Sequence, residues 1–262
     1  MKVQETAPIR ANTLIQTDYY QVDLHAPKIA ARAQPGQFIH VRLPALTHRT
    51  LRRPFSIFDV DTTAGTVSVV YKIVGEGTAH LARLEPGTDL DAMGPLGNGF
   101  TLPEAGSQPV IVAGGYGCAA TYLLAKRSPE RCLCLFGGKS EHDVLLLDAF
   151  EDLGSEVRIA TEDGSCGKQG LVTVLLDEFL AHPAPRPRIY ACGPNAMLKA
   201  VSQRVLEAGL DAEVSLDHKM CCGVGACFAC VVKMKADTSS GWEYVRTCTD
   251  GPVFKASRTI WD

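Results

Sequence analysis

Four cysteines near the end of the chain follow a fixed spacing that restricts what this region can fold around. Cys222, Cys227 and Cys230 read C-x4-C-x2-C, and Cys248 follows after a further 17 residues. This is the plant-type ligand spacing of a [2Fe-2S] cluster. The small residues between the first two cysteines allow a tight loop whose backbone N–H groups point at sulfur. The sequence therefore predicts a cluster-binding loop that Cys248 closes from a separate turn.

Structural zinc and a secreted disulfide framework fit the cysteines less well. Structural zinc more often uses two C-x2-C hooks, and only Cys227 and Cys230 form one. The chain has ten cysteines, as a secreted disulfide framework would need, but its first residues lack a signal-peptide core and its length exceeds that of typical disulfide-stapled domains. A cytoplasmic metal or cluster site fits better. Cys221 does not keep the four-residue spacing and is expected to be a packing residue, as are Cys118, Cys132, Cys134 and Cys166.

Length and charge limit the remaining possibilities. At roughly 100–200 residues per domain, 262 residues predict two domains with a small appendage. The net charge of -3 gives no basic surface for nucleic acid. The longest uncharged apolar stretch, about residues 109–125, is too short and too glycine-rich for a membrane span of ~20 residues. We therefore expect neither a nucleic-acid partner nor a membrane segment.

Residues 1–103 alternate short β-type runs with Pro/Gly turns, which predicts an antiparallel sandwich or small barrel. One short helix is expected, beginning at Thr78 and ending at Glu85-Pro86-Gly87. Residues 104–211 instead contain four apolar strands, each followed by a helical pattern, which predicts a Rossmann-like parallel sheet covered on both faces. Residues 212–262 form the cysteine-bearing segment.

Arg53-Pro54-Phe55-Ser56 resembles the Arg-x-Tyr/Phe-Ser signature of ferredoxin-reductase-type flavoproteins. The resemblance implies that the Arg meets the flavin pyrophosphate and the Ser reaches the flavin ring, and an Arg fork is suited to phosphate. A glycine-rich turn at a helix start, Gly75-Glu76-Gly77-Thr78, could hold phosphate as well. Tyr71 could equally be a core-facing strand aromatic. The further candidate FAD residues are Val70, Tyr71, Lys72, Gly77 and Thr78.

Two segments of the second domain are candidates for binding a nicotinamide cofactor. The turn with Gly114, Gly115 and Gly117 follows a strand and begins a helix, although it lacks the strict G-x-G-x-x-G fingerprint and could be a tight turn without a ligand. Cys192-Gly193-Pro194 resembles the Cys-Gly-Pro segment of the same reductases, which places the Cys near the nicotinamide as a positioning group. No catalytic side chain is predicted, because the flavin itself carries the hydride chemistry.

Two acids, Glu162 and Asp163, follow the third strand of this domain. If their loop meets the adenosine ribose, acids favour free hydroxyls and repel a 2′-phosphate. The sequence therefore predicts NAD rather than NADP.

Taken in order, the three segments resemble the electron-transfer subunits of dihydroorotate dehydrogenase B. The resemblance rests on RRPFSIFDV, YKIVGEGT, GPLGNGF, TEDGS, CGPNAM, MCCGVGACFAC and RTCTDGPVF. Departures are Tyr116 and Ala119-Ala120 in place of a more regular Gly/Pro-rich turn, a slightly long spacing to the fourth cysteine, and the additional Cys221. These departures bear on the expected nicotinamide contacts and leave the flavin and cluster assignments unaffected.

The resemblance implies a partner catalytic subunit that oxidises dihydroorotate with FMN in a TIM barrel, in de novo pyrimidine (UMP) biosynthesis. Electrons would pass through the [2Fe-2S] cluster and FAD of this chain to NAD, in a heterotetramer of two catalytic and two electron-transfer subunits. A TIM barrel needs ~250 residues of its own, so this chain has no room for one. The alternatives are a reductase subunit of a hydrogenase or ferredoxin-NAD(P) oxidoreductase complex, and a non-catalytic, zinc-stabilised binding module.

Overall fold

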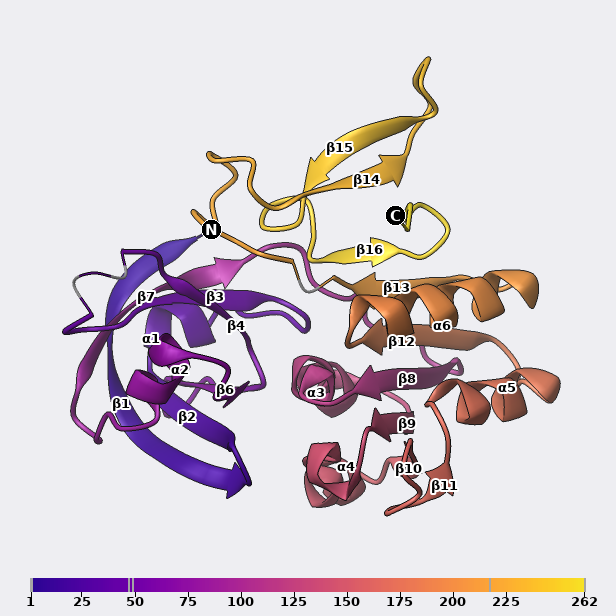
Figure 1. Ribbon diagram of the computed structural model, residues 1–262, viewed down its shortest axis with the longest axis horizontal. Helices are drawn as coiled ribbons and strands as arrows, with labels where there is room; N and C mark the ends of the chain where they lie inside the picture. The colour runs from indigo at the N-terminus through magenta and orange to yellow at the C-terminus, as the bar shows by residue number, and fades with distance from the viewer. Residues whose placement is uncertain (1, 47, 49, 217, 262) are drawn as a thin grey trace.

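The computed structural model describes residues 2–46, 48, 50–216 and 218–261, and its strands form two seven-stranded sheets and a two-stranded hairpin. The first sheet and the second, helix-covered sheet lie side by side, and the hairpin lies above them in Figure 1. The segment that carries the predicted cluster therefore lies close to both sheets.

The first sheet is antiparallel throughout, with the strand order β4-β3-β7-β1-β2-β6-β5. The end strand β4 approaches β6, the strand next to the other end, since the rings of Phe55 on β4 and Tyr71 on β6 lie 5.7 Å apart. Apolar side chains of alternating strand positions fill the interior. This confirms the predicted antiparallel barrel. The elements are β1 (Val3–Gln16), β2 (Tyr19–His25), α1 (Pro27–Ala30), β3 (Phe38–Arg42), β4 (Arg53–Ser56), β5 (Asp59–Asp61), β6 (Thr66–Lys72), α2 (Glu76–Leu81) and β7 (Asp89–Leu96).

Helix α2 begins at Glu76, two residues before the expected start at Thr78, and ends at Leu81, before the expected Glu85-Pro86-Gly87. Thr78 is the third residue of the helix, and its Oγ1 accepts hydrogen bonds from the N–H groups of Val74 and Gly75 at 2.9 and 3.3 Å. The hydroxyl thus caps the helix from inside the first turn, which is why placing Thr78 at the start of the helix was wrong.

The second sheet has the order β11-β10-β9-β8-β12-β13-β16, and all its strand pairs are parallel except β13 with β16. Helices α3 and α4 cover the face toward the barrel, and α5 and α6 cover the opposite face (Figure 1). The predicted parallel sheet is confirmed. Its elements are β8 (Gln108–Gly114), α3 (Gly117–Arg127), β9 (Leu133–Gly138), η1 (Glu141–Asp143), α4 (Leu147–Asp152), β10 (Glu156–Thr161), β11 (Lys168–Gln169), α5 (Thr173–Ala181), β12 (Pro187–Cys192) and α6 (Asn195–Glu207).

The last segment is shared between the second sheet and the cysteine loop. Strands β13 and β16 extend the second sheet, and the chain between β13 and β14 runs back toward the barrel (Figure 1). Strands β14 and β15 pair as an antiparallel hairpin. The elements are β13 (Ala212–Ser215), β14 (Val231–Lys235), β15 (Trp242–Arg246) and β16 (Val253–Lys255).

Candidate functional site

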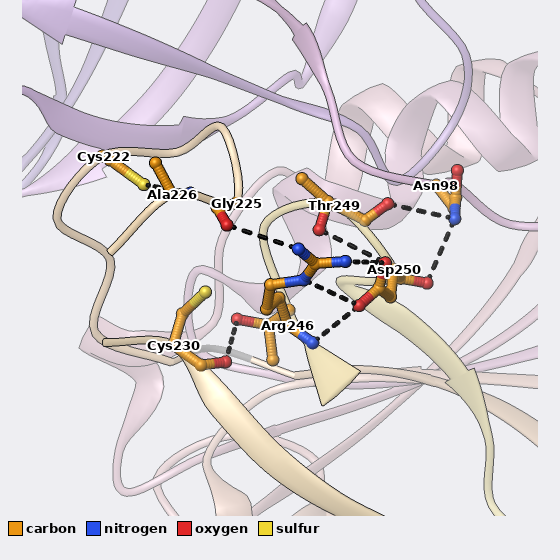
Figure 2. A network of polar contacts seen from close by, with 9 residues as sticks. Asn98, Cys222, Gly225, Ala226, Cys230, Arg246, Thr249 and Asp250 are labelled. Atoms are coloured by element: carbon orange, nitrogen blue, oxygen red, sulfur yellow. Dashed lines mark hydrogen bonds and ion pairs between the residues drawn. The ribbon is translucent and has the colours of Figure 1, made fainter. Parts of the chain in front are cut away.

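The cysteine loop turns its backbone N–H groups toward the first of the four cysteines. The N–H groups of Val224 and Ala226 donate to Cys222 Sγ at 3.5 and 3.3 Å, the second of which Figure 2 shows. Burial acts to raise the pKa of Cys222, but the backbone N–H groups of Val224 and Cys227 and the Cys227 side chain lower it to about 6. The loop therefore favours the thiolate form, which is the form that binds iron.

The four predicted ligands contact one another in two pairs. The side chain of Cys227 lies close enough to Cys222, and that of Cys230 close enough to Cys248, to shift the pKa of its neighbour. A zinc ion takes four ligands around one point, whereas a [2Fe-2S] cluster has two irons and takes two thiolates at each. The paired arrangement fits the two-iron cluster.

One pair is buried and the other reaches the surface. Cys230 and Cys248 are 2% and 0% exposed and pack against Phe38 and Leu96 of the barrel. Burial, followed by contact with Cys230, raises the pKa of the Cys248 thiol to about 12. Cys227 is exposed. A cluster held here would have one side against the barrel and the other near solvent.

Arg246 links the cysteine loop to the turn in which Cys248 lies, as Figure 2 shows. Its Nη1 donates to the carbonyl of Gly225 at 3.3 Å, and its Nε lies 3.3 Å from Asp250 Oδ2. The N–H and Oγ1 of Thr247 both donate to the carbonyl of Cys230, at 3.0 and 3.1 Å. These hydrogen bonds join the loop with Cys222, Cys227 and Cys230 to the turn with Cys248, and the two segments together form the cysteine site.

Asn98, just after β7, ties this unit to the barrel. Its Nδ2 donates to the carbonyls of Thr249 and Asp250 at 3.3 and 3.1 Å (Figure 2), and its N–H donates to the carbonyl of Gly251. The sequence pattern did not single out Asn98, Arg246 or Asp250. The only signal was their presence in the family-like stretches GPLGNGF and RTCTDGPVF.

His40 was also missed. It lies on β3, is 0% exposed, and its ring meets the cysteine loop at Gly223. Burial lowers the pKa of His40 to about 4; the charges of Arg52 and Arg53 act in the same direction, and a backbone contact with Cys222 partly opposes them. The ring is therefore uncharged near neutral pH.

The predicted flavin motif forms strand β4, with Arg53 beside the first turn of α2. A Cβ atom on Gly77 would lie 2.8 Å from Arg53 Nε, so the guanidinium packs where only a glycine leaves space. Phe55 is in the barrel core, whereas Ser56 is exposed and Pro54 is half-buried. Arg53 and Gly77 are therefore brought together beside a free edge of the barrel, where an Arg fork can bind phosphate.

The other predicted flavin residues have partners of their own. The Tyr71 hydroxyl donates to Asn12 Oδ1 at 3.0 Å, and burial raises the pKa of Tyr71. Val70 is buried beside Phe58 and Ala119, while the Thr78 hydroxyl caps α2. Lys72 Nζ lies 3.4 Å from Asp143 of the second domain. These contacts place Tyr71 in the core, which was one of the two interpretations that the sequence left open.

The three glycines between β8 and α3 differ in what surrounds them. A Cβ on Gly117 would lie 2.3 Å from the carbonyl oxygen of Cys192, and one on Gly114 would lie 2.7 Å from Met197 Sδ and 3.1 Å from Pro194 Cδ. Gly115 has φ of +53° and meets nothing within 4 Å. Two glycines thus allow this turn to pack on Cys192-Gly193-Pro194, and the third borders open space, although its own N–H donates to the carbonyl of Gly137 at 3.0 Å.

The acids predicted to select NAD lie at the carboxyl end of β10 and are exposed. Asp163 Oδ1 accepts hydrogen bonds from the backbone N–H and the hydroxyl of Ser165, at 2.9 and 2.6 Å. These bonds order the acidic loop. Because parallel strands have their carboxyl ends at the same edge of the sheet, the loop lies at the edge where the glycine turn lies.

Three family descriptions match the chain in sequence order. Residues 5–100 match the oxidoreductase FAD-binding domain, residues 111–203 the oxidoreductase NAD-binding domain, and residues 217–260 the iron-sulfur cluster binding domain of dihydroorotate dehydrogenase B.

Curated relatives align over nearly the full length. The chain is 36% identical over 259 residues to the dihydroorotate dehydrogenase B (NAD(+)) electron transfer subunit of Desulforamulus reducens, covering 98% of each chain. It is 39% identical to the subunit of the same name from Shouchella clausii, covering 99% of each. The corresponding Enterococcus faecalis subunit is 38% identical and covers 98% of each.

Solved structures agree on the fold. A structure of the NADH-dependent reduced ferredoxin-NADP oxidoreductase superposes with a TM-score of 0.86 at 27% identity, covering 98% of this chain and 91% of that one. The ferredoxin reductase of carbazole 1,9a-dioxygenase gives 0.69 at 21% identity, covering 80% and 67%. No helix in the described ranges is both long and apolar enough to span a membrane.

Proposed function

This chain belongs to the family of dihydroorotate dehydrogenase B electron transfer subunits, and on that premise we propose that it carries electrons from the FMN of a partner catalytic subunit to NAD⁺ in pyrimidine biosynthesis. The observation that carries this proposal is the arrangement of two thiol pairs, Cys222 with Cys227 and Cys230 with Cys248, against the barrel. When bound, the [2Fe-2S] cluster supplies single-electron transfer and FAD exchanges electrons singly or as a pair.

The barrel would bind FAD mainly through two of its residues. Arg53 offers its fork to the pyrophosphate beside Gly77, and exposed Ser56 offers a hydroxyl to the flavin ring. Thr78 and Tyr71 would support this site without contacting FAD, since Thr78 caps α2 and Tyr71 packs in the barrel core. Pro54 is half-buried on the same strand, Phe55 and Val70 pack beneath the surface, and Lys72 links it to the second domain.

The second domain would bind NAD at the carboxyl edge of its parallel sheet. The open space beside Gly115 would admit the pyrophosphate, while Gly114 and Gly117 let the turn pack closely on Cys192, Gly193 and Pro194. Cys192 is 8% exposed at the end of β12, where it would position the nicotinamide rather than react. Glu162 and Asp163 would repel a 2′-phosphate.

We further propose a boundary between the FAD and NAD domains at residues 103 and 104, and a cluster segment of residues 212–262 that shares β13 and β16 with the NAD sheet. The working assembly is a heterotetramer of two such chains and two FMN-containing catalytic subunits. We place it in the cytoplasm, because a reducing compartment keeps cluster thiols free of disulfides.

Co-expression with the catalytic subunit tests this function. The purified complex is expected to contain FMN, FAD and a dithionite-bleachable cluster, and to reduce NAD⁺ when dihydroorotate is added. A colourless chain containing one zinc per molecule would overturn the proposal and favour the zinc-stabilised module.

The resemblance to the ferredoxin-NADP oxidoreductase structure supports a second candidate, a reductase subunit of such a complex. The higher identity, 36–39%, to dihydroorotate dehydrogenase B subunits favours the first. NAD⁺ reduction that depends on reduced ferredoxin and is unaffected by dihydroorotate would favour the second.

A further inference from the structure

His40 lies between the strand of the flavin motif and the cysteine loop. On β3 it is paired with Pro54 of β4 on one side and with Met93 of β7 on the other. Opposed residues of an antiparallel pair point to the same face of a sheet, so His40, Pro54 and Met93 share one face. Met93 packs with the buried cysteines, which identifies this face as the one that the cysteine loop covers.

The contact between His40 and the loop is close and depends on a glycine. A Cβ on Gly223 would lie 2.6 Å from His40 Nδ1, nearer than real Cβ contacts allow, and the φ of Gly223 is +70°. A side chain at residue 223 would therefore be both strained and blocked by the ring. The backbone next to Cys222 is thus seated directly on the imidazole.

Neither ring nitrogen of His40 makes a well-formed hydrogen bond among the described residues, although both are buried and a backbone group of Cys222 lies close enough to act on the ring. The rings of His40 and Phe38 meet edge to face at 6.1 Å, and Phe38 in turn contacts Cys230 and Cys248. A buried polar group whose hydrogen bonds are poorly formed costs free energy, so an imidazole held here favours a better acceptor on the loop side.

We propose that His40 is a positioning residue for the iron-sulfur cluster: its imidazole seats the Cys222–Gly223 turn on the flavin-binding sheet and donates its ring N–H to a sulfur of the cluster. Hydrogen bonds to cluster sulfurs stabilise the more negative, reduced form and so raise the reduction potential. Through His40, the strand that carries the flavin motif and the loop that carries the cluster hold a fixed mutual position. This inference rests on the proposed function, because it requires the cluster to be present.

The test is redox titration of the co-expressed complex, followed by EPR of the reduced cluster and absorbance of the flavins. His40→Leu is expected to make the cluster harder to reduce by on the order of tenfold in the equilibrium constant, which is about 59 mV for one electron, and to change the EPR spectrum. His40→Asn, which places an amide near the Nδ1 position, is expected to restore much of the wild-type potential. His25→Asn is the matched control, because its Nδ1 is also buried without a partner but lies on β2.

The outcomes separate this inference from the proposed function. A wild-type complex without a cluster signal would overturn the proposed function, and this inference with it. A wild-type cluster whose potential and EPR spectrum are unchanged by His40→Leu would overturn the role of His40 alone. If His40→Leu shifts the potential and His40→Asn shifts it equally, the ring acts only by filling space, and the hydrogen-bond part of the inference is wrong.

A double-mutant cycle keeps the inference testable if His40→Leu fails to hold a cluster. Gly223→Ala is expected to lower cluster content in the otherwise wild-type chain, because the new methyl group meets the imidazole. In a His40→Ala background the same change is expected to have a smaller effect, and the φ strain at residue 223 cancels between the two comparisons. Equal effects in both backgrounds would show that His40 does not seat the turn.

Discussion

The hydroxyl of Tyr19, on β2 of the barrel, donates a 2.9 Å hydrogen bond to Asp143 Oδ1 in η1 of the second domain. Lys72 Nζ lies 3.1 Å from the Tyr19 oxygen and 3.4 Å from the same carboxylate. The carboxylate is 23% exposed, so water screens this link only in part. Because it joins the barrel to the second domain, the link helps to fix the distance between the two proposed sites.

Removing the Tyr19 hydroxyl is expected to weaken this link. Tyr19→Phe should lower the free energy of unfolding by about 1–2 kcal/mol, because a partly buried carboxylate loses a donor. Urea unfolding measures the change. Tyr20→Phe is the control, since no hydrogen bond of the Tyr20 hydroxyl is found within the described ranges. Equal losses in the two variants would contradict the prediction.

The same link predicts a dependence on acid. Burial acts to raise the pKa of Asp143, but Tyr19 and Lys72 hold it below its ordinary value. A carboxyl whose pKa is lower in the folded state stabilises the fold above about pH 4, and this contribution disappears as pH falls through the folded-state pKa. The stability difference between wild type and Tyr19→Phe should therefore be full at pH 7 and shrink below about pH 4. A difference that does not shrink anywhere in the acid range before the fold is lost would contradict the role of Asp143 as the acceptor.

Cys227→Ser is expected to abolish the visible and EPR signals of the cluster and leave FAD bound, because the thiol partner of Cys222 is lost while the barrel is untouched. Iron content and released flavin are measured on the same preparation. Cys221→Ser is the control, as Cys221 lies outside both thiol pairs and should leave the signals intact. Loss of FAD together with the cluster in Cys227→Ser would contradict the separation of the two sites.

Arg53→Ala is expected to weaken FAD binding about tenfold or more, since the guanidinium beside Gly77 is the proposed pyrophosphate ligand. The neighbouring Arg52 provides a matched control. It pairs with Asp91 and donates to its carbonyl at 2.7 Å, so Arg52→Ala should lower stability but keep FAD affinity. Fluorescence of released FAD during dialysis gives both affinities. Equal affinities in the two variants would show that Arg53 does not bind the pyrophosphate.

Local patterns were sufficient to predict much of this molecule. The strand and helix order follows from hydrophobic periodicity, and the loop around Cys222 follows from cysteine spacing and small residues that let N–H groups reach sulfur. The start of α2 was misplaced because Thr78 caps the helix from its third residue instead of from the residue before the helix. A threonine looks the same in the sequence in either position, and only the structure shows which N–H groups its hydroxyl accepts from.

Contacts between segments that are distant along the chain could not be predicted from the sequence. His40 meets Gly223, and Asn98 bonds to Asp250, across more than 150 residues in each case. A histidine or asparagine in a strand or turn has no local feature that reveals such a partner. Lys72 was predicted to belong to the flavin surface, yet its ion pair with Asp143 depends on how the two domains pack.

Two nearby glycine changes separate ligand binding from packing in the second domain. Gly115→Ala adds a methyl group that meets nothing within 4 Å, at a φ of +53° that costs about 1–2 kcal/mol of stability. Because the open space beside Gly115 is the proposed place of the pyrophosphate, the added methyl group should also weaken NADH binding about tenfold. Gly117→Ala instead forces its methyl group against the Cys192 carbonyl and should lower stability by about 1–3 kcal/mol. Thermal unfolding and NADH titration of both variants decide the matter. Wild-type NADH affinity in Gly115→Ala would place the nicotinamide cofactor elsewhere on the sheet edge.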